Sequence, residues 1–265
     1  MRPALWGIVN VTPDSFSDGG SFADSLAAAD HALRLLDEGA EVVDVGGEST
    51  RPGAAPVAAA DEIVRTAPVI AAIARRAPGA RISIDTSKAE VARAALSAGA
   101  TIVNDVTALQ DPQMASACAA AGCFVALMHM RGNPRSMQLD TQYADLEGEV
   151  VAFLADRAQR AIAAGIRPER LLVDPGLGFG KTPEANFRLI RAIPKLAALG
   201  FPVLIGASRK SFVGKASGVE HAADRVYGSI GAALAATRHG ASALRVHDVA
   251  ATRQALDVFC AAERA

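Results

Sequence analysis

The stretch between residues 171 and 182 reads Leu-Leu-Val-Asp-Pro-Gly-Leu-Gly-Phe-Gly-Lys-Thr. It begins with an apolar run that ends in Asp174, continues through a glycine-rich turn, and leads into a helical pattern that opens at Pro183. The turn is not a P-loop, because the first glycine of that motif would have to stand at Pro175. Nor is it the dinucleotide fingerprint, since its glycines are spaced as G-x-G-x-G. The stretch therefore predicts a strand, a turn and a helix, with a carboxylate at the strand end and glycines that admit a ligand close to the backbone.

The same unit recurs along the whole chain. Short apolar runs predict strands at 5–10, 41–45, 81–86, 101–106, 124–130, 171–174, 203–208 and 243–248. Amphipathic or alanine-rich stretches predict helices at 24–39, 60–77, 88–98, 112–121, 144–164, 184–199, 221–240 and 249–263. The longer connections lie at 12–23, 48–59, 131–143 and 209–221. Eight strand–helix units in 265 residues predict one α/β domain over residues 1–265, a (β/α)8 TIM barrel with its active site at the C-terminal ends of the strands. A doubly wound open sheet is the alternative, but it usually has fewer units and a phosphate fingerprint in its first turn.

Composition argues against nucleic acid and membrane partners. The net charge is −1, aromatic residues make up 5%, and the Lys and Arg residues are scattered without a basic block. The longest uncharged run, 196–208, is broken by Gly200 and Pro202 and is shorter than the roughly 20 residues of a membrane span. The N-terminus lacks the pattern of a signal peptide, and the cysteines, without a CxxC spacing, are typical of reduced thiols. We therefore expect a cytoplasmic protein with small-molecule substrates.

Strand alternation places polar side chains at the mouth of the predicted barrel. Side chains two positions apart share one face of a strand, and one face of a barrel strand points to the interior. If Ile82 and Ile84 pack outward on helices, Asp85 points inward, and the same parity applies to the other strands. The inward polar residues at the strand ends are then Asn10, Asp85, Asn104, Asp174, Arg245 and His247. Their convergence indicates an active site, because barrel enzymes carry their chemistry at this end.

These residues lie in motifs that resemble those of the dihydropteroate synthase family of pterin-binding barrels. The matching motifs are GIVNVTPDSFSDGG at 7–20, DVGGESTRPG at 44–53, SIDT at 83–86, VNDV at 103–106, MHM at 128–130, the stretch at 174–182, SRKS at 208–211 and RVH at 245–247. Because they occur in order, the resemblance covers the chain from Gly7 to the last helix. It implies a transferase of folate biosynthesis that condenses 6-hydroxymethyl-7,8-dihydropterin diphosphate with para-aminobenzoate to give 7,8-dihydropteroate and diphosphate.

For the pterin ring, the resemblance and the chemistry of the residues agree. A carboxylate can accept two parallel N–H bonds from a flat aminopyrimidine edge. The residues that the resemblance places around the ring are Asp85, Asn104 and Asp174 at the edge, Lys210 as a cationic partner, and Met128 and Phe179 as apolar walls. Buried carboxylates without a ligand or a counterion would be costly, which favours binding over a purely structural role.

For the diphosphate, the resemblance implies positive charge from Arg51, Arg245 and His247. It also implies Asn10 as a ligand of Mg²⁺, with the ion shared by diphosphate oxygens. Mg²⁺ suits such a site because it prefers oxygen and is usually held by few protein groups together with phosphates. The residues with catalytic roles would be Asp85, Lys210, Arg245 and His247.

For para-aminobenzoate, the resemblance implies Phe16, Thr50, Pro52 and Ser211. The connection at 12–23, which contains Asp18, is rich in Ser, Gly and Asp and has the composition of a mobile lid. We expect Asp18 to become ordered when substrates bind. Related enzymes are commonly dimers, and the alanine-rich helix at 222–239 offers a face for a homodimer; affinity for sulfonamide mimics of para-aminobenzoate is also expected from the resemblance.

Two other functions remain as alternatives. One is a methyltransferase of the same pterin-binding fold that acts on methyltetrahydrofolate, and the other is a catalytically silent pterin-binding paralogue. The motifs at 10–20, 49–52 and 208–211 argue against the first, because they serve diphosphate and amine in the synthase. The presence of Asn10, Arg51, Lys210 and His247 argues against the second.

Some polar residues in the motifs are predicted to be structural. His129 has the outward parity of its strand, so we expect it to pack against helices. Lys181 and Thr182 are expected to serve the turn and the helix start. Asp44 and Asp105 occupy motif positions, but the sequence assigns them no chemical role.

Overall fold

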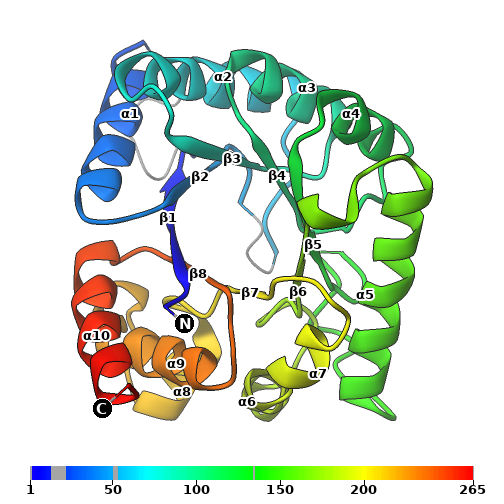
Figure 1. Ribbon diagram of the computed structural model, residues 1–265, viewed down its shortest axis with the longest axis vertical. Coiled ribbons are helices and arrows are strands. Elements are labelled where there is room, and N and C mark those ends of the chain that lie inside the picture. The colour runs from blue at the N-terminus through cyan, green and yellow to red at the C-terminus, as the bar shows by residue number, and fades with distance from the viewer. Residues whose placement is uncertain (1, 13–21, 50–52, 134, 265) are drawn as a thin grey trace.

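A computed structural model describes residues 2–12, 22–49, 53–133 and 135–264 of the chain (Figure 1). Its strands are β1 (Ala4–Asn10), β2 (Val42–Gly46), β3 (Arg81–Asp85), β4 (Ile102–Asp105), β5 (Phe124–Met128), β6 (Leu171–Asp174), β7 (Leu204–Ile205) and β8 (Ala243–Val246). They are parallel and form one sheet in the order β6-β5-β4-β3-β2-β1-β8-β7. A bridge between Val173 and Val203 joins its two edge strands. The predicted (β/α)8 barrel is confirmed.

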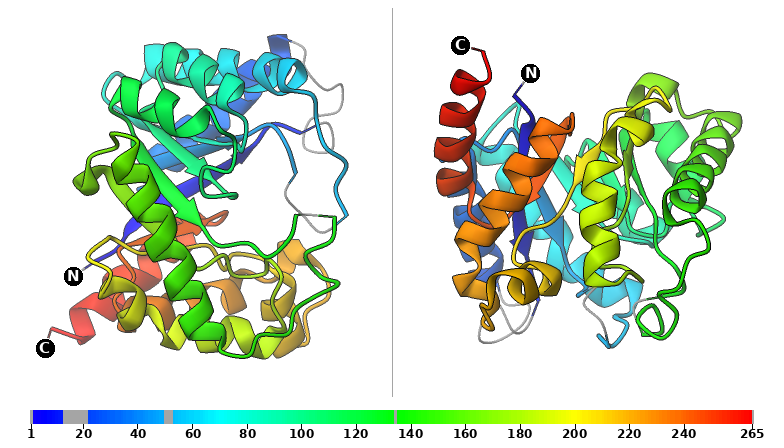
Figure 2. Two further views of the ribbon diagram at one scale, coloured as in Figure 1. Left: turned by 90° about the vertical axis from the view of Figure 1, so that its right-hand side faces the viewer. Right: turned by 90° about the horizontal axis from the view of Figure 1, so that it is seen from below.

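Helices surround the barrel on its outer face, and both ends of the chain lie on the same side of it (Figures 1 and 2). They are α1 (Phe22–Asp37), α2 (Ala59–Arg76), α3 (Ala89–Ala98), α4 (Met114–Ala121), α5 (Leu146–Ala163), α6 (Pro183–Arg191), α7 (Ile193–Ala197), α8 (Ser211–Ser217), α9 (Val226–Arg238) and α10 (Val249–Ala262). Short 3₁₀ turns occupy Pro168–Arg170 and Ala222–Asp224. Over the described residues, no helix combines the length and the apolar character that a membrane span requires.

Two helix predictions need correction, both in the last third of the chain. The stretch at 184–199 is not one helix but two, divided at Ala192. The division is explained by Pro194, which has no N–H group to continue the hydrogen-bond ladder. The connection at 209–221 contains the helix α8, and α9 begins only at Val226, after a 3₁₀ turn.

The core has two layers, as strand alternation predicted. The barrel interior holds a small apolar cluster of Trp6, Val42, Ile102, Ala126, Leu172, Leu204 and Ala243. The larger cluster lies between the strands and the helices and includes Ile82, Ile84 and Leu244. Interior and outward side chains alternate along each strand. A polar residue that lies two or four positions after one of these interior residues therefore also faces the interior. The fold thus fills the barrel with apolar side chains and presents polar ones at its mouth.

Candidate active site

A buried ionic cluster links strands β2, β3, β4 and β8. Arg245 donates from Nε to Asp44 Oδ2 at 2.5 Å and from Nη2 to Asp85 Oδ2 at 2.7 Å. Asn104 Nδ2 donates to the same oxygen of Asp44 at 3.0 Å. Asp44 is fully buried, while Asp85 and Asn104 are 9% and 4% exposed. Asp44 is not among the site residues predicted from the sequence, although a signal was present: Val42 faces the interior, so Asp44 shares its parity.

One oxygen in each of the two carboxylates lacks a partner. Oδ1 of Asp44 and Oδ1 of Asp85 are buried and accept no hydrogen bond within the described ranges. Native proteins satisfy nearly all buried polar atoms, so orphaned acceptors call for a ligand or solvent donor. Burial raises the pKa of Asp85 to about 7, against the lowering effect of Arg245. The cluster is therefore an acceptor-rich site prepared for N–H groups.

Asp174 lies across the barrel, at the end of β6 and the start of the glycine-rich turn. Its Oδ1 accepts from the backbone N–H of Gly176 at 2.7 Å, and its side chain is buried, with a pKa raised chiefly by that burial. Lys210, which precedes α8, donates from Nζ to the carbonyl oxygen of Leu177 and lies 4.6 Å from the ring centre of Phe179. Burial lowers the pKa of Lys210 to about 8, although Asp174 opposes that shift. Asp174 and Lys210 are therefore both bonded to the backbone of the glycine-rich turn.

Apolar side chains cover the side of the site next to this turn. Met128 and Phe179 are both buried and belong to one cluster, whose other members are Val106, Met130 and Met137. Met128 also pairs with Asp174 in the register between β5 and β6. The side chains next to Asp174 are therefore thioether and aromatic groups.

His247 and Asn10 lie on a different part of the mouth. The two residues line a cavity of about 480 Å³ together with Ile8, Ala27, Asp30, His31, Arg34 and Arg209. Nδ1 of His247 is 3.0 Å from Oγ of Ser208, which orients the imidazole. Arg209 is held by Asp248, with Nη2 and Oδ1 2.5 Å apart. This cavity combines an amide oxygen with cationic side chains, a combination that suits an anion and an accompanying metal ion.

The comparisons with known proteins agree on one family. The family model described as "Pterin binding enzyme" matches residues 6–247. Dihydropteroate synthase from Neisseria meningitidis serogroup B is 47% identical over 264 residues, which span 97% of this chain and 92% of that protein. The Escherichia coli K12 dihydropteroate synthase is 44% identical over 257 residues, with 97% and 90% covered.

Solved structures give the same result. Xanthomonas albilineans dihydropteroate synthase with 4-aminobenzoic acid superposes with a TM-score of 0.93 at 48% identity, covering 100% of this chain and 94% of that one. The same enzyme in complex with 7,8-dihydropteroate gives a TM-score of 0.90 at 45% identity, with 100% and 95% covered.

The chain belongs to the dihydropteroate synthase family.

Membership in the dihydropteroate synthase family confirms the resemblance of the motifs and the prediction of a transferase. Several residues that the resemblance assigned to a dihydropteroate synthase site lie outside the described residues; these are Phe16, Asp18, Thr50, Arg51 and Pro52. Ser211 is described and is the exposed first residue of α8, directly after Lys210.

The structural roles that the sequence predicted for His129, Lys181 and Thr182 are also found. Nζ of the buried Lys181 donates to Phe179 O at 2.8 Å and lies 3.0 Å from Nδ1 of His129. The ring of His129 meets Phe153 of α5 edge-on, at 4.9 Å between centres, so it packs outward. Oγ1 of Thr182 accepts from the N–H of Ala185 and caps α6. Both lysines therefore donate to backbone carbonyl groups of the turn: Lys181 to that of Phe179 and Lys210 to that of Leu177.

Asp105 has a structural explanation as well. Its carboxylate accepts from the backbone N–H groups of Thr107 and Leu109, both at 2.8 Å. Ala108 and Leu109 have positive φ angles of 53° and 63°, which are unfavourable for residues with a side chain. Asp105 thus stabilises a tight turn after β4, and it does not belong to the ionic cluster around Arg245.

Proposed function

We propose that this protein condenses 6-hydroxymethyl-7,8-dihydropterin diphosphate with para-aminobenzoate, releasing diphosphate and forming 7,8-dihydropteroate. The observation that carries the proposal is the pair of buried acceptor sites, at Asp85 with Asn104 and at Asp174, at the ends of strands β3, β4 and β6 of one barrel. Related enzymes solved with 4-aminobenzoic acid and with 7,8-dihydropteroate support the identity of the ligands.

In this proposal the pterin lies between the two carboxylates. Asp174 and Asp85 accept N–H groups of the ring, and Asn104 is oriented by its bond to Asp44. Lys210 stands beside Phe179, where its ammonium group can donate to a ring acceptor. Met128 and Phe179 provide the apolar surface for the ring faces. Each contact is of the kind that recognises a flat heterocycle with mixed donors and acceptors.

The diphosphate is assigned to the side of Asn10 and His247. Mg²⁺, when bound, neutralises charge on the diphosphate oxygens; Asn10 supplies a neutral oxygen ligand, as expected of an ion held mainly by phosphates. Within the part of the chain that the structure describes, no group of three His, Cys, Asp or Glu side chains could hold a metal by itself. Arg51, Arg245 and His247 are assigned to the negative charge of the leaving group.

The mechanism we favour is a dissociative displacement. The C–O bond to diphosphate breaks first, and its electron pair leaves with the diphosphate. Asp85 and Asp174 offset the positive charge that develops on the pterin methylene. The neutral amine of para-aminobenzoate then forms the C–N bond and loses its proton to solvent. No strong base is needed, in keeping with a site that pairs its carboxylates with cations rather than with a nucleophile.

Coupled diphosphate release tests the function. Purified protein with pterin diphosphate and Mg²⁺ is expected to turn over when para-aminobenzoate is added. Asp85→Asn and Lys210→Ala are each expected to lower kcat/KM by about 100-fold or more, because both remove groups that contact the reacting ring. Lys215→Ala, at an exposed lysine of α8, the helix that follows Lys210, is the matched control.

Other results would point to the alternative functions. Pterin binding without turnover would indicate a silent paralogue. Methyl transfer from methyltetrahydrofolate would indicate the methyltransferase. A strict requirement for bound amine before any diphosphate is released would contradict the dissociative order.

We also propose that the protein is a homodimer. Helices α6, α8 and α9 enclose an outer cavity of about 710 Å³, lined largely by apolar residues that include Phe187, Val213 and Ala232. Phe187 is 39% exposed and the nearby Tyr227 is 87% exposed, which is unusual for aromatic side chains without a partner surface. A second copy of the chain would cover this face.

Sedimentation velocity tests the dimer. The natural chain is expected to sediment as a dimer and Ala235→Glu, at an exposed position of the cavity lining, as a monomer, because a charge would be buried at the interface. Val258→Glu, at an exposed position of α10, is the control and should leave the dimer intact. A natural chain that remains monomeric at high concentration would refute the proposal.

The cytoplasm is the proposed location. Cys118, Cys123 and Cys260 are all free and buried, as expected in a reducing compartment. A redox-sensitive reporter fused to the chain, or fractionation of the source cells, would check this assignment.

A further inference from the structure

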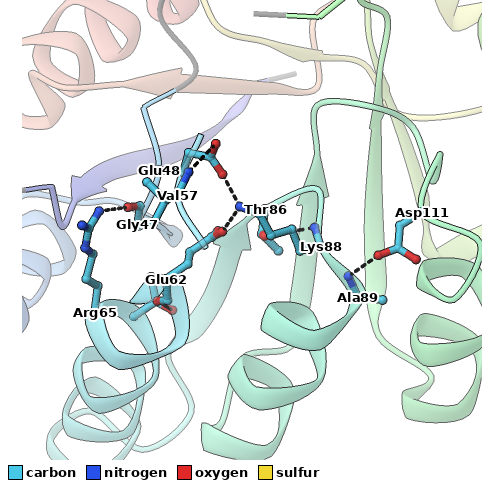
Figure 3. A network of polar contacts seen from close by, with 10 residues as sticks. Gly47, Glu48, Val57, Glu62, Arg65, Thr86, Lys88, Ala89 and Asp111 are labelled. Atoms are coloured by element: carbon cyan, nitrogen blue, oxygen red, sulfur yellow. Dashed lines mark hydrogen bonds and ion pairs between the residues drawn. The ribbon is translucent and has the colours of Figure 1, made fainter. Parts of the chain in front are cut away.

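Two glutamates share one lysine at the base of the connection between β2 and α2 (Figure 3). Nζ of Lys88 forms an ion pair with Glu48, and it lies 2.5 Å from Oε2 of Glu62. Glu48 follows β2, Glu62 lies in the first turn of α2, and Lys88 is the residue before α3. The side chain of Glu62 is fully buried, whereas Lys88 and Glu48 are 25% and 23% exposed. Two consecutive strand–helix units, β2–α2 and β3–α3, therefore meet at this one ammonium group.

The carboxylate of Glu48, at the start of the connection, bonds to the backbone of Val57 near its end. Its Oε1 accepts from the backbone N–H of Val57 at 3.3 Å, while its Oε2 is paired with Lys88. Glu48 and Val57 flank the segment that contains Thr50, Arg51 and Pro52 in the sequence. The position of Glu48 is thus coupled to both ends of that segment.

The backbone next to Glu48 is fixed against α2. Arg65 donates from Nη1 to the carbonyl oxygen of Gly47 at 3.0 Å (Figure 3). A Cβ atom at Gly47 would lie 2.8 Å from Cγ2 of Thr66 and 3.0 Å from Cγ of Glu62. The chain therefore leaves β2 in direct contact with the helix that carries Glu62.

Lys88 is fixed in turn to the strand that carries Asp85. Its backbone N–H donates to Oγ1 of Thr86 at 3.2 Å, and Thr86 directly follows Asp85. The next amide, of Ala89, donates to Oδ2 of Asp111 at 2.9 Å (Figure 3). These backbone bonds fix the start of α3 relative to β3. Through its ion pair with Glu48, Lys88 therefore ties the connection after β2 to β3.

The charge of Lys88 is maintained by its surroundings. Burial lowers its pKa, but the hydrogen bonds and charges of Glu48 and Glu62 outweigh burial, so the pKa is raised overall. Oε1 of Glu62 has no hydrogen-bond partner among the described residues. Without Lys88, the two carboxylates would repel each other, and Glu48 would have to move away from the buried Glu62.

We propose that Lys88 is a positioning residue for the β2–α2 connection: through Glu48, which also accepts from Val57, it fixes both ends of the connection that the resemblance assigns to para-aminobenzoate and diphosphate. The inference rests on the proposed function, because the segment matters only if those ligands bind there. If the salt bridge had only a structural role, its loss would lower stability without weakening the binding of one ligand more than that of another. The two roles are therefore separable by kinetics.

Steady-state kinetics of the full chain provide the test. In Lys88→Met, the KM for para-aminobenzoate is expected to rise about tenfold or more, while the Kd for a pterin that lacks the diphosphate, measured by calorimetry, changes by less than about twofold, because only the diphosphate is assigned to Arg51. Lys88→Arg is expected to restore most of the para-aminobenzoate KM, because it keeps the charge. Lys195→Met, an exposed lysine of α7 that pairs with Glu147, is the matched control and should leave both constants unchanged.

Two further variants keep the test valid if Lys88→Met folds poorly. Glu48→Gln leaves Lys88 to neutralise Glu62 and is expected to raise the para-aminobenzoate KM in the same direction. The double variant Lys88→Met/Glu62→Gln removes the unpaired buried charge and should recover thermal stability without recovering that KM.

The outcomes separate this inference from the function itself. An active natural chain in which Lys88→Met weakens para-aminobenzoate and the pterin without diphosphate equally, or lowers Tm alone, would overturn the inference and leave the function standing. A natural chain without amine-dependent turnover would instead overturn the function, and with it the inference.

Discussion

Replacing Gly176 with alanine is expected to lower the free energy of unfolding by about 3 kcal/mol or more and to abolish pterin binding. Gly176 has a φ of +66°, and a Cβ atom there would lie 1.9 Å from the carbonyl oxygen of His129. The left-handed conformation costs roughly 1–2 kcal/mol with a side chain, and forced overpacking typically adds about 1–3 kcal/mol. The obstructing atom belongs to the backbone after β5, so it cannot rotate away. The turn would have to shift, and with it the N–H that holds Asp174.

Gly200→Ala is the matched control for this prediction. Gly200 also has a positive φ, of +87°, but a Cβ atom there would meet nothing within 4 Å. In this variant the free energy of unfolding should fall by only about 1 kcal/mol, the contribution of the left-handed conformation, and pterin binding should be retained. Urea unfolding of both variants and calorimetric titration with a pterin would measure the difference. Equal losses in the two variants would show that the contact with His129 is unimportant.

Replacing Arg245 with leucine is expected to destabilise the protein by about 3–5 kcal/mol at pH 8, the usual cost of leaving a buried charge without its partner. The guanidinium holds Asp44 and Asp85, which are otherwise two buried carboxylates. Arg238→Leu is the control, since Arg238 is 69% exposed and pairs with Glu263 at 3.5 Å. Exposed pairs of that kind contribute about 0–1 kcal/mol.

The loss in Arg245→Leu should depend on pH. The pKa of Asp85 is raised to about 7 by burial even though Arg245 lowers it, so removing Arg245 raises it further. A carboxyl group with a raised pKa holds its proton in the folded state at pH values where the unfolded chain has released it, so stability falls as pH rises through that window. The difference between the variant and the natural chain should therefore be larger at pH 8 than at pH 5. Urea unfolding at both pH values measures it, and a loss that is independent of pH would contradict this account.

The sequence predicted the elements whose pattern is local. The strand at 171–174 was located to the residue, and the parity that put Ile84 outward and Asp174 inward holds in the structure. Helix α8 was missed because seven residues are too few to show a helical period. The break at Ala192 is not evident from the sequence, because the helical pattern of 184–199 continues on both sides of Pro194.

For the site, the sequence indicated side chains but not the bonds among them. The sequence indicates Asp85, Asn104 and Arg245, and the structure brings them together, but Asp44, the partner of both Asn104 and Arg245, has no chemical role that the sequence assigns. The ion pairs of Lys88 with Glu48 and Glu62 join positions 40 and 26 residues apart. Pairings between distant positions depend on how the helices pack, and no local pattern contains that information. The assignments of Arg51 and Phe16, outside the described residues, stay predictions.

The way the barrel closes divides it into a stiff and a compliant half. Strands β1 and β2 are paired over five positions, from Trp6 with Val42 to Asn10 with Gly46, whereas β6 meets β7 through the single bridge of Val173 with Val203. Local opening occurs where few backbone bonds hold neighbouring segments together. The cluster around Arg245 lies on the arc from β8 through β4, while Asp174 lies beside the seam. The ion pairs of Arg245 are therefore held on the rigid arc, and adaptation to the size of a bound ring falls to the glycine-rich turn with Asp174 and Lys210.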